Sequence, residues 1–164
     1  MIQKKIALLG SPGVGKTSLV RRFVESIFDD KYLTTIGVKI DKKVVSAGGQ
    51  NVTLMLWDVA GAEERFSVPT SYIRGAAGIV LVADGTRPET LDDAVQILDG
   101  VHRELGPLPF VLLLNKADLT GQWRVDGRDA HARVPAALHV ASSSAKTGAS
   151  VDAAFLNLAT ALTT

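Results

Sequence analysis

The sequence predicts an α/β fold, with a mostly parallel sheet covered by helices on both faces. Short β-rich segments alternate with segments of helical periodicity, which is the pattern of strands joined by crossover helices. The β-rich segments that start at Lys5, Gly78 and Phe110 are apolar enough to lie inside a sheet. A chain of 164 residues, 46% of them hydrophobic, is sufficient for one core, so we expect a single domain over residues 1–164.

Six segments are expected to be strands. They cover residues 5–9, 38–47, 52–58, 78–84, 110–115 and 138–141. The second and third are separated by Gly48 and Gly49, and because glycine tolerates positive φ, this dipeptide favours a hairpin turn. We therefore expect one antiparallel pair in an otherwise parallel sheet.

Helical patterns occupy the intervals between these strands. We expect helices over residues 16–26, 89–105 and 150–162, and weaker ones over residues 65–74 and 127–133. Pro88 lies where a helix can begin, and Gly106 with Pro107 lies where a helix must stop. The chain contains no internal repeat, linker or low-complexity tract.

Composition excludes several classes of partner and site. The 18 basic and 17 acidic residues give a formal charge of +1, so we expect no nucleic-acid partner. The absence of cysteine excludes disulfides and cysteine-linked lipids, and residues 161–164 carry no prenylation signal, so no lipid anchor is expected. The longest apolar runs are far below the roughly 18 residues of a membrane span. We expect a cytoplasmic monomer without a signal peptide.

Residues 10–17 predict a phosphate-binding loop of the P-loop NTPase type. Their sequence, GSPGVGKT, fits G-x-x-x-x-G-K-[ST] and lies between an apolar strand and a helix. Backbone N–H groups would surround a phosphate, the lysine would neutralise the β- and γ-phosphates, and the threonine hydroxyl would ligate magnesium. A plain strand-to-helix turn is the disfavoured alternative. The expected binding residues are Gly13, Val14, Gly15, Lys16, Thr17 and Ser18.

Asn115, Lys116 and Asp118 predict recognition of guanine. They follow an apolar strand, and open α/β sheets bind ligands at the carboxyl ends of their strands. A carboxylate at Asp118 can accept from N1–H and from the 2-amino group of guanine, whereas adenine has neither donor. Asn115 would tie this loop to its neighbours, and the Lys116 stem would lie over the base. Taken alone, the pattern also fits an exposed loop with Asp118 as a helix cap.

A serine-rich segment follows the last expected strand and contains Ser144, Ala145 and Lys146. The Ala145 N–H and the Lys146 side chain can close over the same base, although the segment alone also fits a simple turn. The three histidines, His102, His131 and His139, have no serine or carboxylate at a telling spacing. A catalytic triad or a histidine metal site is therefore not predicted.

Five motifs in order give the chain a resemblance to the small GTPases of the Ras superfamily, nearest the Rab branch and similar in style to prokaryotic Rab-like proteins. The motifs are the phosphate loop and residues 34–37 (TTIG), 57–61 (WDVAG), 115–118 (NKAD) and 144–146 (SAK). The resemblance covers essentially the whole chain. It implies a sheet of order 2-3-1-4-5-6, a nucleotide site at the strand carboxyl ends, and GTP or GDP with Mg²⁺ as ligands.

The resemblance also implies roles for single residues. Phe28 would pack edge-on against guanine, Thr35 would bind magnesium when GTP is present, Asp58 would hold magnesium through water, and the Gly61 N–H would contact the γ-phosphate. The chemistry of Asp58 and Gly61 agrees, whereas Thr35 alone also fits an exposed strand-edge threonine. The expected metal-binding residues are Thr17, Thr35 and Asp58, and the expected catalytic residues are Lys16, Thr35 and Gly61.

Two positions depart from the family pattern. Ala62 stands where the family usually has a water-positioning glutamine, so we expect nucleotide binding to persist and hydrolysis to be slow. Glu63 is a substitute water-polarising group or, alternatively, part of a solvated helix start. Pro12 restricts the approach to the γ-phosphate, because its ring is rigid and it has no N–H.

Other positions bear on partners and charge. Trp57 and Tyr72 resemble an aromatic partner-binding surface of Rab proteins, but Ile40 replaces an expected Phe, and ordinary sheet packing explains all three equally well. Cationic side chains near the phosphate accelerate its transfer, so the chain's arginines are possible arginine fingers, with surface ion pairing as the favoured alternative. The arginines concerned are Arg65, Arg74 and Arg87.

The leading interpretation is a cytoplasmic switch with slow GTP hydrolysis, which recruits effector and regulatory proteins through segments 28–37 and 61–74. The alternative is a GTP-binding module that signals by occupancy, with negligible hydrolysis; Ala62 favours it. A kinase with a phosphate loop is disfavoured by Asp118 and by the short chain.

Overall fold

The computed structural model of the protein describes residues 2–26, 28, 38–59 and 70–164. Within them lies a six-stranded sheet of order β2-β3-β1-β4-β5-β6, which confirms the expected fold class and order. Among the described strands, only β2 and β3 pair in antiparallel fashion. The strands are β1 (Ile2–Leu9), β2 (Val38–Ala47), β3 (Gln50–Val59), β4 (Gly78–Asp84), β5 (Phe110–Asn115) and β6 (His139–Ser142).

The turn between β2 and β3 explains the antiparallel pair. Ala47 faces Gln50 in the ladder, so the turn consists of Gly48 and Gly49 alone. Both glycines have positive φ, at 60° and 79°. A two-residue type I′ turn requires this conformation at both positions, and residues with a Cβ rarely adopt it. The glycine pair therefore sets the register of the edge strand.

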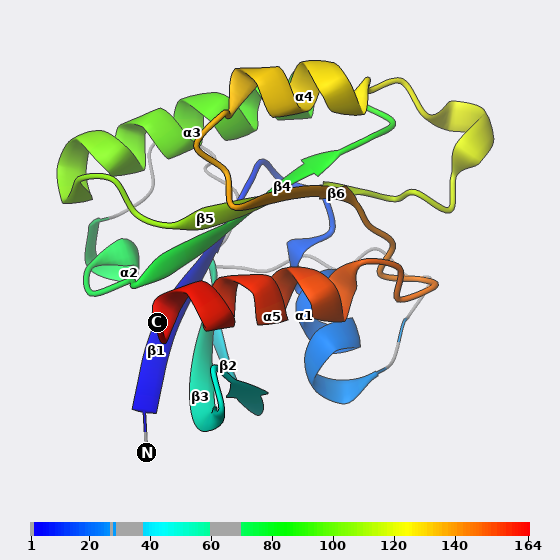
Figure 1. Ribbon diagram of the computed structural model, residues 1–164. Coiled ribbons are helices and arrows are strands. Elements are labelled where there is room, and N and C mark those ends of the chain that lie inside the picture. The colour runs from blue at the N-terminus through cyan, green and yellow to red at the C-terminus, as the bar shows by residue number, and fades with distance from the viewer. Residues whose placement is uncertain (1, 27, 29–37, 60–69) are drawn as a thin grey trace.

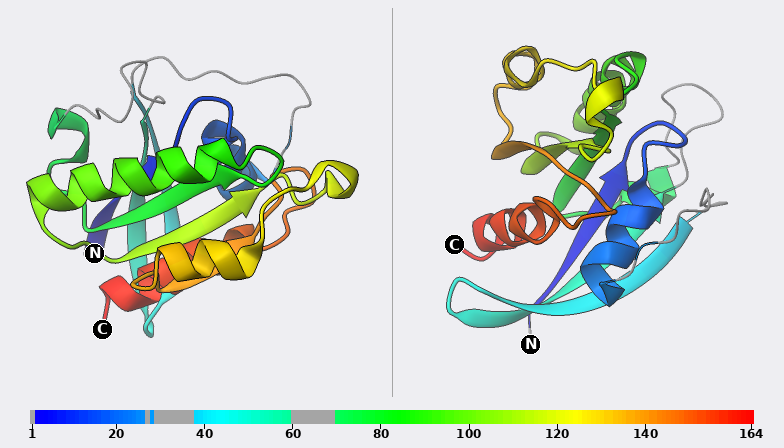
Figure 2. Two further views of the ribbon diagram at one scale, coloured as in Figure 1. Left: turned by 90° about the horizontal axis from the view of Figure 1, so that it is seen from above. Right: turned by 90° about the vertical axis from the view of Figure 1, so that its right-hand side faces the viewer.

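Helices cover both faces of the sheet (Figure 1). On one face lie α1 (Lys16–Glu25) and α5 (Val151–Leu162), and on the other lie α2 (Thr70–Ile73), α3 (Glu89–Leu105) and α4 (Gly127–Arg133). Figure 2 shows the two helical layers on opposite sides of the strands. No helix in the described ranges is both long and apolar enough to span a membrane.

Two apolar cores result, because successive strand side chains point to opposite faces. Leu8 belongs to the core under α1 and α5, and its neighbour Leu9 belongs to the core under α3. In the first core, Phe23 of α1 stacks on Phe155 of α5 with ring centroids 4.1 Å apart and planes 8° from parallel. Both rings are buried. The stack holds α1, which follows the phosphate loop, firmly against α5.

Helix ends differ slightly from the expected ones. α1 ends at Glu25, because Ser26 takes a left-handed conformation with φ 58°. α5 begins at Val151, because Ser150 likewise has φ 61°. Of the weak helix expected over residues 65–74, the structure describes only α2, since residues 65–69 lie outside the described part of the chain.

Strand ends also differ. β1 begins at Ile2, three residues early, because its first residues pair with β3, which is itself longer than expected at both ends. β6 runs one residue later than expected, from His139 to Ser142, along the register of β5. A short 3₁₀ helix, η1 (Thr120–Gln122), was not expected from the sequence.

Candidate functional site

Loops that follow β1, β4, β5 and β6 meet with the end of β3 at the carboxyl edge of the sheet. The loop after β1 is the phosphate loop, the loop after β5 carries the predicted base-recognition residues, and the loop after β6 carries the serine-rich segment. Side-chain hydrogen bonds join all three. Open α/β sheets bind their ligands at this edge.

The phosphate loop packs tightly against its surroundings. Gly13 and Gly15 have φ of 78° and 101°, which residues with a Cβ rarely adopt. A Cβ added to Gly15 would lie 2.3 Å from Asn115 Nδ2, and one added to Gly10 would lie 2.4 Å from the Val82 carbonyl oxygen. Glycine is therefore required both for the loop conformation and for its close contact with the strands. The first N–H groups of α1 lie at the end of this loop, where they can bind an anion.

Lys16, the first residue of α1, turns its side chain into the loop. The residue is 6% exposed, and Nζ donates to the Gly10 carbonyl at 2.9 Å and to the Ser11 carbonyl at 3.4 Å. Burial lowers the pKa of Lys16 to about 8, although the negative charge of Asp58 acts to raise it. An ammonium group removed from water in this way gains strongly from a bound anion, because the anion favours its charged form.

Thr17 and Asp58 place two oxygen ligands side by side. Thr17 Oγ1 donates a hydrogen bond of 2.6 Å to Asp58 Oδ2, and Asp58 is 1% exposed near the end of β3. Mg²⁺ prefers hard oxygen ligands and, in nucleotide sites, is held by one or two carboxylates together with phosphates and waters. The hydroxyl and carboxylate oxygens are therefore of the kind that could hold a magnesium ion.

Asn115 and Lys116 join the loop after β5 to the phosphate loop. Asn115 Nδ2 donates to the Val14 carbonyl at 2.9 Å, and its Oδ1 accepts from Ser143 Oγ at 3.2 Å. Lys116 Nζ donates to the Gly13 carbonyl at 2.9 Å. Lys116 also has φ 74°, an uncommon conformation for a residue with a Cβ that persists where its contacts hold it in place.

Asp118 faces the loop after β6. Ser144 Oγ donates to Asp118 Oδ1 at 2.8 Å and accepts from the Thr147 N–H at 3.0 Å. Because the serine hydroxyl has one proton, the Thr147 contact leaves that proton directed at the carboxylate. Ala145 is buried and Lys146 is exposed in the same loop. The serine therefore orients the carboxylate that the sequence assigns to the base.

Asp84, at the end of β4, is a member of this site that sequence reasoning missed. Its buried Oδ2 accepts from Lys116 Nζ at 2.8 Å and from Arg87 Nε at 3.0 Å. Burial by itself raises the pKa of the Asp84 carboxyl, but hydrogen bonds from Lys116, Thr86 and Arg87 hold that pKa below its usual value. Arg87 Nη2 also donates to the Pro12 carbonyl at 3.2 Å. The sequence signal that could have revealed Asp84 is an aspartate at the end of an otherwise apolar strand.

The structure describes only some of the other residues predicted for the site. Thr35, Gly61 and Ala62 lie outside the described residues. Phe28 is 37% exposed, and Ser18 is partly buried on α1.

The structure describes the contacts of some of the remaining candidates. Arg87 forms the ion pair with Asp84 given above, whereas Arg65 lies outside the described residues. Ile40 is opposite Trp57 on the sheet and 45% exposed, and Lys5 Nζ lies 3.6 Å from the centroid of the Trp57 ring. Tyr72 packs against the second core.

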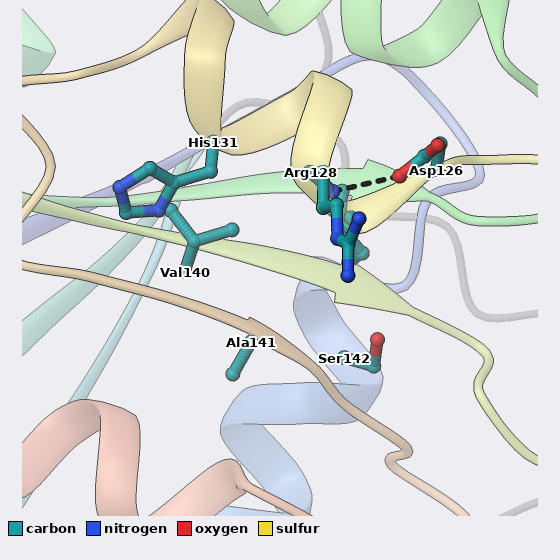
Figure 3. A pocket seen from close by; sticks show the side chains of 8 residues that line it. Asp126, Arg128, His131, Val140, Ala141 and Ser142 are labelled. Atoms are coloured by element: carbon teal, nitrogen blue, oxygen red, sulfur yellow. Dashed lines mark hydrogen bonds between the residues drawn. The ribbon is translucent and has the colours of Figure 1, made fainter.

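A hollow of about 370 Å³ lies between α4 and the ends of β5 and β6 (Figure 3). Asp126 and Arg128 border it, and the Asp126 side chain accepts from the Arg128 N–H at the start of α4. His131, one of the three histidines considered above, also lines it and projects from α4. None of the residues expected to contact a nucleotide lines this hollow.

Comparison with known proteins identifies the family. The model of the Ras family matches residues 5–164. The chain is 34% identical to Ras-related protein Rab-1C of Dictyostelium discoideum, over 94% of this chain and 78% of that protein. It is 33% identical to Ras-related protein Rab-10 of Caenorhabditis elegans (96% and 80%) and 35% identical to Ras-related protein RABD2c of Arabidopsis thaliana (98% and 80%). The chain therefore belongs to the Ras family and is a Rab-like small GTPase.

Proposed function

We propose that the chain is a molecular switch that binds GTP or GDP with Mg²⁺ and hydrolyses GTP slowly. One observation carries the proposal: the carboxyl edge of the sheet gathers a buried ammonium group, a hydroxyl–carboxylate pair and a second, oriented carboxylate. These groups belong to Lys16, to Thr17 with Asp58, and to Asp118. A guanine nucleotide with its metal needs one group of each kind, for phosphate, magnesium and base.

At the base end, Asp118 accepts from N1–H and the 2-amino group of guanine. The hydrogen bond from Ser144 supports this role, because it fixes the direction of the carboxylate. Asn115 and Lys116 hold the loop against the phosphate loop, which sets the distance between base and phosphate sites. The Ala145 N–H and the side chains of Lys146 and Phe28 complete the base site.

At the phosphate end, the loop N–H groups and Lys16 bind the phosphates. Thr17 binds magnesium through its hydroxyl and Asp58 holds it through water, Thr35 joins them when GTP is bound, and the Gly61 N–H contacts the γ-phosphate. The ion neutralises charge on the phosphates during their transfer. The buried position of Lys16 and the oxygen pair of Thr17 and Asp58 support this arrangement.

The proposal is tested by titrating the unmodified protein with GTP, GDP and ATP by calorimetry, with magnesium and again with a chelator. GTP and GDP should bind, and ATP should bind about 10⁴-fold more weakly, because a site built to hydrogen-bond a donor rejects an analogue that lacks it. Removing magnesium should weaken GTP binding. ATP competing equally with GTP would show that the base assignment is wrong.

Hydrolysis is expected to depend on position 62. With a glutamine there and no helper protein, such a site turns over at roughly 10⁻⁴ s⁻¹, so this chain with Ala62 should hydrolyse GTP at or below that order. Ala62→Gln places a donor and an acceptor beside the γ-phosphate and should speed unaided turnover, provided that Pro12 does not block the water. Phosphate release under single-turnover conditions with magnesium measures both rates.

The same measurement separates two functions. If bound GTP decays no faster than GTP in a buffer blank, the second candidate is favoured. This candidate is a GTP-binding module that signals by occupancy, and the presence of Ala62 supports it. A parent rate far above the stated order, unchanged in Ala62→Gln, would mean that Glu63 or another residue orients the water. Glu63→Ala would then be the next variant to measure.

We place this cycle in the cytoplasm, in a monomer whose partners are effector and regulatory proteins. Segments 28–37 and 61–74 would be ordered by the γ-phosphate and would present the partner surface. The formal charge of +1 supports protein rather than nucleic-acid partners.

A further inference from the structure

Arg22 links the helix that follows the phosphate loop to the loop that follows β6. The side chain leaves the last turn of α1, and its Nε donates to the Ala145 carbonyl at 2.7 Å. Its Nη2 donates to the carbonyl of the next residue, Lys146. The stem passes beside Gly148, where an added Cβ would lie 3.7 Å from Arg22 Cδ. More than a hundred residues of sequence thus separate the arginine from the loop that it holds; in Figure 1 this loop lies beside α1.

Hydrogen bonds within the loop leave little freedom for the segment that Arg22 contacts. The Ser144 N–H donates to the Ala149 carbonyl at 3.1 Å, and the Gly148 N–H donates to the Ser144 carbonyl at 2.8 Å. Ser144 also holds Asp118. The Arg22 guanidinium also holds the carbonyls of Ala145 and Lys146. The loop is therefore held both by its own hydrogen bonds and by a side chain of α1.

An arginine suits this position better than other residues. Its planar guanidinium presents several N–H groups in a fixed fork and so can hold two successive carbonyls at once, whereas a lysine acts as a single point charge. The same helix begins with Lys16 and Thr17, six and five residues earlier. Arg22 therefore couples the helix of the phosphate site directly to the loop of the base site.

We propose that Arg22 is a positioning residue for base selection, which holds the Ala145–Lys146 segment so that the Ala145 N–H faces the 6-oxo group of guanine. The inference rests on the proposed function, since it assumes a guanine between Asp118 and this loop. Arg22 touches no nucleotide in this scheme. By fixing the Ala145 N–H, Arg22 favours bases that have a hydrogen-bond acceptor at C6. Guanine has an oxo group there, whereas adenine has an amino group.

The test compares Arg22→Gln with Arg21→Gln. Arg21 is the matched control, because it is the neighbouring arginine and its ion pair with Glu25 is of the surface i,i+4 kind. Competition with a fluorescent guanine nucleotide gives dissociation constants for GDP, IDP and ADP. Arg22→Gln should weaken GDP and IDP alike by about 10- to 100-fold, because both carry the 6-oxo group and lose a contact held by charge-assisted hydrogen bonds.

ADP distinguishes positioning from general support. Its affinity should change little in Arg22→Gln, so the preference for GDP over ADP should fall by about tenfold or more. Arg21→Gln should leave that preference unchanged. Arg22→Lys should show a smaller loss in the same direction, and it carries the test if the glutamine variant does not fold.

The outcomes separate the two proposals. An unmodified protein that does not prefer GDP over ADP would overturn the proposed function and this inference together. Normal preference in the unmodified protein, with Arg22→Gln behaving as Arg21→Gln does, would overturn only the inference. Equal weakening of GDP and ADP in Arg22→Gln would also overturn it, because it would show that the arginine supports the fold and not the choice of base.

Discussion

The Lys16→Ala variant is expected to bind both GDP and GTP about 30- to 5,000-fold more weakly than the unmodified protein, which corresponds to about 2–5 kcal/mol. The ammonium group is buried and held by the carbonyls of Gly10 and Ser11, so it is already in place before a phosphate arrives. Burial lowers its pKa to about 8, and a bound phosphate would favour the charged form of the group. Calorimetric titration with each nucleotide measures the loss.

Two further variants test whether this loss is specific to Lys16. Lys42→Ala removes an exposed lysine from β2 and should leave both affinities unchanged, which controls for net charge. Thr35→Ala should spare GDP and weaken mainly GTP, because its proposed magnesium contact exists only with GTP. Full-strength binding of both nucleotides by folded Lys16→Ala would show that the phosphates bind elsewhere.

The Asp118→Asn variant is expected to exchange guanine for xanthine. GTP should lose about 10²- to 10⁴-fold in affinity, because one acceptor is replaced by a donor and the other acceptor loses its charge. Xanthine nucleotides, which present an acceptor at C2, should gain. In the proposed site, the Ser144 proton would keep the amide oxygen on its own side, so that the amide N–H₂ would be turned toward the base. Competition binding of GTP and XTP measures both changes.

Asp126→Asn is the matched control for this substitution. Asp126 is an exposed aspartate that caps α4, and asparagine caps helices about as well. It should leave the choice between GTP and XTP unchanged. If Asp118→Asn also kept the original choice, the base would have to be recognised by another residue, and Asp118 would be only a cap or a loop residue.

The sequence by itself determined the features that depend on local pattern. The apolar runs of β4 and β5 predicted both strands at their observed limits, because a strand buried on both faces is mostly apolar. The dipeptide Gly48-Gly49 predicted the hairpin, because few other residues adopt positive φ twice in succession. The order of residues 10–17 predicted a phosphate loop from chemistry alone, and the strand order followed from the resemblance carried by the five motifs.

Tertiary structure alone decided which side chains support those motifs. Asp84 binds Lys116 and Arg87, and Arg22 binds the carbonyls of Ala145 and Lys146. No local pattern predicts such pairs, because they depend on which strands are neighbours and on how far a helix carries a side chain toward a distant loop. The burial of Lys16, and with it the lowered pKa, is likewise a consequence of the loop closing over it. Sequence spacing predicts the groups that would meet a ligand, whereas packing decides which side chains hold those groups in place.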